Sequence, residues 1–123
     1  MNTAEFCDAI GFRTGLKRQL AEKIRDVTAA LCRLDLDAID PATDNDYLCS
    51  RMFDGWDELT FLMKLEEALN VEISDSVQLP NFVMRRFFFF YKKPKPLNYG
   101  EWVKSVVEIL APIVADQLKE KSN

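Results

Sequence analysis

Apolar side chains recur at three- and four-residue steps in three segments of this chain, and this spacing constrains the fold more than any other feature. The segments run from Gly15 to Leu34, from Asp54 to Asn70, and from Asn98 to the C-terminus. Such steps place apolar side chains along one face of a helix. No strand alternation, internal repeat or domain linker is visible. We therefore expect residues 1–123 to form a single all-α domain.

Capping residues mark the starts of the first and last of these segments. Thr14 is a good N-cap for the first helix, and Asn98 precedes Glu101 by three residues, which is the spacing of a capping box. Pro112 interrupts the last segment, but the apolar phase continues beyond it. We expect a kink at the proline, with a break near Leu110 as the alternative.

The middle segment predicts the best-defined helix. Asp54 is a good N-cap, Asp57 and Glu58 place negative charge in the first turn, where the helix dipole favours it, and Asn70 suits the exit. The positions expected to face the core are Leu59, Leu62, Leu65 and Leu69, widened by Phe61 and Ala68.

The segment from Asp35 to Tyr47 lies between the first two helices and lacks an apolar period. It is rich in aspartate and contains one Asp-Pro step, so we expect a connecting loop with room for one helical turn. Leu36, Ile39 and Leu48 are its expected anchors to the core.

The net charge of −4 conceals a strong segregation along the chain. Residues 13–33 carry six basic and two acidic side chains, residues 34–76 carry two basic and twelve acidic, and residues 77–100 carry five basic and none acidic. The acidic middle should attract a basic partner and repel nucleic acid.

Composition excludes several classes of function. The chain has no histidine, which excludes Ser-His-Asp and Cys-His catalysis and two-histidine metal sites. Cys7, Cys32 and Cys49 are spaced like neither a disulfide framework nor a zinc site. The first twelve residues lack the features of a signal peptide, and the longest apolar run is far shorter than the ~20 residues of a membrane span. We expect a cytoplasmic protein with no metal.

A motif at the start of the middle helix resembles the acyl carrier protein family. In that family the second helix opens with Asp-Ser-Leu and ends with a Leu-Glu-Glu segment that leads into a Glu-Ile step. Here Asp54-Gly55-Trp56 falls on the first motif, and Glu66 and Glu67 fall on the paired glutamates. The similarity is best over residues 20–73. It implies an acyl-carrier-like four-helix bundle with long loops and an aromatic insertion, residues 78–96, before the last helix.

The departure from the family pattern decides the chemistry. Carrier proteins attach phosphopantetheine to the serine hydroxyl, whereas Gly55 has no oxygen to phosphorylate. The chain is similar to a small bacterial group of carrier-like proteins that lack this serine and share the Pro-Leu-x-x-Gly-Glu pattern found here at residues 96–101. The resemblance thus implies a non-enzymatic protein without a cofactor.

Ser76 offers an alternative attachment site, because Asp75-Ser76-Val77 also spells the attachment tripeptide. A basic aromatic run follows it, in place of the acidic helix that the attaching enzyme reads. We therefore expect Ser76 to be a helix cap, with attachment as the alternative.

The resemblance implies that the acidic middle helix docks on a basic patch of a protein partner. The expected partner-binding residues are Asp54, Trp56, Asp57, Glu58, Glu66 and Glu67. The alternative is a solvated, well-capped helix, with Trp56 buried against the preceding loop. Adjacent helical positions point about 100° apart, so Glu66 and Glu67 cannot share one small catalytic site.

A basic aromatic stretch precedes the last helix, with five consecutive aromatic residues at positions 87–91. They cannot all face one side of a helix or strand, so a second interaction patch is expected there. Its residues are Arg85, Arg86, Phe88, Tyr91, Lys92 and Lys93. Completion of the core is the main alternative. Single-stranded nucleic acid binding and shallow membrane insertion are weaker ones, because the remaining surface is acidic and the run lacks an amphipathic pattern.

Two functions follow from these patterns. The first is a non-enzymatic acyl-carrier-like protein that lacks a pantetheine arm and binds a protein partner through its acidic second helix. The alternative is an acidic immunity or inhibitor protein that neutralises a basic toxin such as a nuclease.

Overall fold

The structure, a computed structural model, describes residues 1–45, 47–48, 58–74, 77, 79 and 98–121. Over these residues the chain is helical and contains no strand, which confirms the all-α class; an isolated antiparallel bridge joins Asp44 to Asn98. The elements are α1 (Thr3–Ala9), α2 (Gly15–Cys32), the 3-10 helix η1 (Leu36–Ala38), α4 (Glu58–Leu69) and α6 (Tyr99–Lys121).

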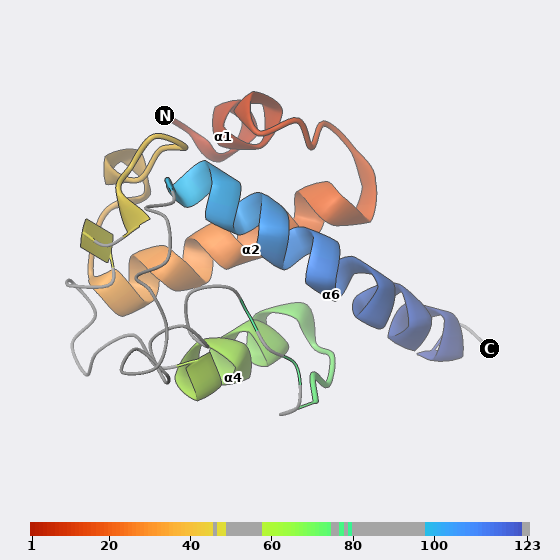
Figure 1. The fold of residues 1–123 in the computed structure, drawn as a ribbon. Helices are drawn as coiled ribbons and strands as arrows, with labels where there is room; N and C mark the ends of the chain where they lie inside the picture. The colour runs from red at the N-terminus through yellow and green to blue at the C-terminus, as the bar shows by residue number, and fades with distance from the viewer. Residues whose placement is uncertain (46, 49–57, 75–76, 78, 80–97, 122–123) are drawn as a thin grey trace, which may run out of the picture.

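Helix α2 is the centre of the packing. It contacts α1, η1, α4 and α6, and Figure 1 shows α6 running across it with α1 and α4 on opposite sides. Because neighbouring elements contact α2 on several sides, more than one face of this helix is buried. Leu16, Leu31 and Leu34, which the three- and four-residue spacing places on the core-facing stripe, are half-buried at the edge of the core. The buried positions of α2 are Leu20, Ala21, Ile24, Arg25, Val27, Thr28, Ala29 and Cys32.

The ends of α2 differ in detail from the prediction. The helix begins at Gly15 as expected, but the side chain of Thr14 makes no capping hydrogen bond. It ends before Leu34 because Arg33 adopts a left-handed conformation with φ of 55°. The amide of Leu34 then donates to the carbonyl of Ala29 at 3.0 Å, as in a Schellman motif.

Helix α1 lies in a region that carries no predicted element. The side chain of Asn2 accepts from the amide of Glu5 at 2.8 Å, and the side chain of Glu5 accepts from the amide of Asn2 at 3.1 Å. This capping box starts a seven-residue helix that buries Phe6 and Cys7 against α2.

The anchors of the loop after α2 match their prediction, since Ile39 and Leu48 are fully buried and Leu36 packs half-buried against the core. The segment is more helical than expected: besides the turn η1, Asn45, Tyr47 and Leu48 are helical. The exit of α4 also matches, since Asn70 has a left-handed φ of 55°.

Helix α6 is continuous through Pro112, so the alternative of a break near Leu110 is wrong. Its start is capped as predicted, with the side-chain oxygen of Asn98 accepting from the amide of Glu101 at 2.9 Å. The predicted aromatic insertion at residues 78–96 lies almost entirely in the part of the chain that the structure does not describe.

The start of α6 is fixed by the loop that follows η1. The amide of Tyr99 donates to the carbonyl of Thr43 at 2.8 Å, and the amide of Gly100 donates to the carbonyl of Pro41 at 2.9 Å. A Cβ atom on Gly100 would lie 2.8 Å from Cβ of Pro41 and 3.1 Å from its carbonyl oxygen. This contact therefore requires glycine at position 100.

Gly100→Ala should lower the free energy of unfolding by about 1–3 kcal/mol, because the added methyl group forces the loop and the helix apart. Urea denaturation, monitored by circular dichroism, measures the change in the free energy of unfolding. Ser105→Ala, at an exposed position of the same helix, is the control and should change stability by less than about 0.5 kcal/mol. Helix propensity alone would make Gly100→Ala stabilising, so a more stable variant contradicts the close contact.

Candidate functional site

Only part of the predicted partner-binding site falls on described residues. Asp54, Gly55, Trp56 and Asp57 lie outside them, as does Ser76. The whole predicted second patch lies outside them too: Arg85, Arg86, Phe88, Tyr91, Lys92 and Lys93. Glu58 is the first residue of α4, and Glu66 and Glu67 lie in its last turn.

Helix α4 has one face in the core and one in solvent. Phe61, Leu62 and Leu65 are buried, as the apolar spacing predicts. Ala68 was expected on the same side and is exposed instead, because its single methyl group in the last turn does not reach the core. The outer face of α4 consists of Thr60, Met63, Lys64, Glu67 and Ala68, all of them exposed.

Met63 is the apolar residue of this face, and the sequence prediction missed it. Its side chain is 54% exposed, more than any other large apolar side chain in the described part of the chain. Met63 and Leu65 are two positions apart, which places them about 160° from each other around the helix. This angle could have predicted the exposure of Met63 from the sequence, because it places Met63 opposite the core-facing Leu65.

The two glutamates have different surroundings, in keeping with their different directions on the helix. Glu66 is half-buried, whereas Glu67 is exposed and its carboxylate lies 3.9 Å from the ammonium of Lys64. An exposed pair of this kind contributes at most about 1 kcal/mol and leaves both groups accessible. The acidic end of α4 is therefore a charged surface with a methionine beside it.

Packing on α2 and contacts with α6 hold α4 in place. The ring of Phe61 packs edge-on against Trp102, with centroids 5.4 Å apart and planes at 76°. Beyond the helix, the amide of Glu72 donates to the side-chain oxygen of Gln117 at 2.8 Å, and the side-chain nitrogen of Gln117 donates to the carbonyl of Glu72. The outer face of α4 is thus presented on a fixed support.

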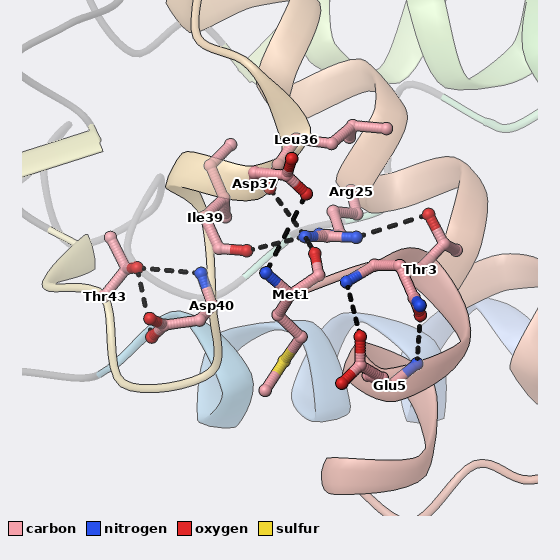
Figure 2. A network of polar contacts seen from close by, with 10 residues as sticks. Met1, Thr3, Glu5, Arg25, Leu36, Asp37, Ile39, Asp40 and Thr43 are labelled. Carbon is pink, nitrogen blue, oxygen red and sulfur yellow. Dashed lines mark hydrogen bonds and ion pairs between the residues drawn. The ribbon is translucent and has the colours of Figure 1, made fainter.

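A second polar cluster lies in the interior, around Arg25 (Figure 2). This side chain is fully buried on α2. Its Nη2 atom donates to the carbonyls of Met1 at 2.6 Å, Leu36 at 2.6 Å and Ile39 at 2.9 Å. Its Nη1 atom donates to Oγ1 of Thr3 at 3.3 Å.

These contacts give Arg25 a structural role. The guanidinium also lies over the ring of Phe6, 4.9 Å from its centroid, so its remaining face is covered. No ion pair to Arg25 occurs among the described residues, and its charge is balanced by carbonyl dipoles. It joins the N-terminal segment and η1 to α2, and it offers no surface to a ligand.

Two buried nucleophiles, Cys7 and Tyr99, are held in their neutral forms. Burial, followed by the charge of Glu22, raises the pKa of the Cys7 thiol above its usual range. Burial likewise raises the pKa of Tyr99, whose hydroxyl donates to Oγ1 of Thr28 at 2.7 Å. Neither group is a nucleophile near neutral pH.

The described residues contain no group of three or more histidine, cysteine or acidic side chains that could hold a metal ion. None of the helices in this part of the chain is long and apolar enough to cross a membrane.

Comparisons of the chain with models of protein families, with curated proteins and with solved structures give no match. The likeness to acyl carrier proteins therefore rests on the motif residues themselves.

Arg25→Met should lower the free energy of unfolding by about 2–4 kcal/mol, because three carbonyls lose their donor and the one on Ile39 is buried. Urea denaturation gives the value. Lys23→Met, on the same helix and partly exposed, removes the same charge and should change stability by less than about 0.5 kcal/mol. Equal effects from the two substitutions would contradict the role assigned to the buried network.

Proposed function

We propose that this chain is a non-enzymatic, acyl-carrier-like protein without a pantetheine arm, and that it binds a protein partner through α4. The observation that carries the proposal is the outer face of α4. There Met63 is exposed beside Lys64 and Glu67 on a helix whose opposite side is locked into the core.

The composition of this face suits recognition of another protein. Interfaces concentrate their binding energy in a few apolar or aromatic side chains surrounded by polar ones, and methionine is enriched at such positions. An exposed Met63 beside charged neighbours has this arrangement. A partner gains by covering the methionine while its own polar groups contact the rim.

The charge of the sequence segment that contains α4 indicates the kind of partner. Residues 34–76 carry twelve acidic and two basic side chains, and the exposed Glu67 belongs to this segment. A surface of this sign speeds the encounter with a basic partner and disfavours an acidic one. We infer a partner whose docking surface is basic with an apolar pocket.

The order of helices supports an acyl-carrier-like four-helix bundle. Helices α2, α4 and α6 take the places of the family's first, second and last helices, and the loop with η1 joins the first two. In this alignment α1 is an addition at the N-terminal end. Gly55 takes the place of the attachment serine, so the proposed activity is binding alone.

Met63→Glu and Glu67→Lys should each reduce capture of the partner from native cell extract by about tenfold. Met63→Glu removes the apolar anchor, and Glu67→Lys reverses charge at the rim. Quantitative mass spectrometry of the retained proteins measures the change.

Asp116→Lys is the matched control, because it reverses an exposed acidic charge on α6 instead of on α4. It should retain the partner. If all three variants retain the same protein equally, the outer face of α4 is not the docking site. A basic nuclease as the retained protein would favour the immunity-protein alternative.

Incubation with coenzyme A and a promiscuous phosphopantetheinyl transferase should leave the intact mass unchanged, because Gly55 has no hydroxyl group. Intact-mass spectrometry checks this, with a Gly55→Ser variant as the informative comparison. An added mass on the unmodified sequence would locate an arm on Ser76 and would overturn the proposal.

A further inference from the structure

A groove of about 770 Å³ lies between α6 and the connection from α1 to α2. Phe12 and Leu16 form one apolar wall, and Ala111 and Ala115 form the other. The groove is open along its length and is lined mainly by apolar surface. No residue of α4 lines it, so it is separate from the docking face proposed above.

Charged side chains lie on both walls of this groove. The ammonium of Lys17 on α2 lies 2.9 and 3.1 Å from the carboxylate oxygens of Glu108 on α6. Both side chains are about half exposed, and an ion pair of this kind is easily exchanged for another partner. Arg13 also lines the groove, and its guanidinium makes no ion pair or hydrogen bond with any described residue. The two cations against one carboxylate leave the groove complementary to an anion.

Backbone groups at the groove provide hydrogen-bond donors on α2 and a hydrogen-bond acceptor on α6. Thr14, Leu16 and Lys17 line the groove at the start of α2, where no side chain caps the helix and no acidic residue lies in the first turn. Their amides are free of helical acceptors. On α6, Pro112 has no N–H, so the carbonyl of Glu108 lacks its usual helical donor.

We propose that this groove binds the C-terminal residue of an extended peptide segment from a partner protein. The terminal carboxylate lies against Arg13 and Lys17, in place of Glu108. The apolar side chain of the same residue lies between Leu16 and Ala111. The peptide N–H donates to the carbonyl of Glu108, and capture of a terminal carboxylate by cations and amides is an established mode of peptide recognition.

The shape of the groove favours a peptide over a free aliphatic acid. A small ligand needs a site that covers most of its surface, and this groove is an open trough. An aliphatic acid also has no donor for the carbonyl of Glu108, whereas a peptide supplies one next to its carboxylate.

The test is a titration of the full chain, labelled with ¹⁵N, with the peptide N-acetyl-Gly-Ser-Ala-Val-Leu in its free-acid form. The amide form of the peptide and sodium octanoate are the comparison probes. The free acid should shift the amide signals of residues 15–17 and of Ala111 and Ala115. The amide form should bind at least about tenfold more weakly, and octanoate should give no saturable shift.

Two charge variants should change the affinity in opposite directions. Arg13→Glu should weaken binding of the free acid by about fivefold or more, and Glu108→Gln should strengthen it by about threefold, because Lys17 then has no internal competitor. Lys104→Glu and Glu101→Gln make the same charge changes at exposed positions of α6 outside the groove and should leave the affinity unchanged.

Three results would overturn the proposal: equal binding of the acid and amide peptides, saturable binding of octanoate without the peptide, or a weaker complex with Glu108→Gln. The amide spectrum of each variant shows that the fold is kept. The outcome is independent of partner capture by α4, since Met63→Glu should bind the peptide as the unmodified chain does.

Discussion

The buried guanidinium of Arg25 is the interaction on which the rest of the structure depends. A cation taken out of water must be surrounded by acceptors, and here the acceptors are the carbonyls of Met1, of Leu36 at the start of η1 and of Ile39 directly after it. Their convergence fixes the path of the loop after α2. Two residues further on, that loop meets the start of α6 through Pro41 and Gly100. One charged side chain on the central helix thereby determines where the last helix begins.

The aromatic core carries this arrangement to α4. The ring of Phe6, which lies under the guanidinium, has its centroid 5.7 Å from that of Tyr99. Tyr99 stacks on Trp102 with 5.9 Å between ring centroids, and Trp102 packs edge-on against Phe61. The row of rings runs from α1 through α6 to α4, and each ring is fully buried. A shift of α6 disturbs the contacts to both other helices, and a shift of α1 or α4 disturbs its own contact with α6. The outer face of α4 therefore has one fixed position relative to the N-terminal segment.

The sequence predicted the parts of the fold that local rules control. Apolar spacing located α2, α4 and α6, and capping rules placed Asn98 and Asn70 correctly, because these signals act within one or two helical turns. Helix α1 was missed although Asn2 and Glu5 have the spacing of a capping box, because its seven residues are too few to show an apolar period. Arg25 was missed because its acceptors come from two segments, the N-terminal one and the one around η1, that no local pattern brings together. Of the predicted docking residues, Glu58, Glu66 and Glu67 lie on the expected helix, and the exposed Met63 was identified from the packing of α4.

The contact between Gly100 and Pro41 has a consequence for how such a sequence can diverge. The two backbones approach so closely that a side chain at position 100 requires a different loop at position 41. Substitution at either position alone lowers stability, although the two positions are far apart in the chain. Among descendants of this sequence, glycine at the second residue of the last helix should persist as long as the loop keeps its proline and its length. The two positions should then be replaced together, which would mark the contact as covariation in an alignment.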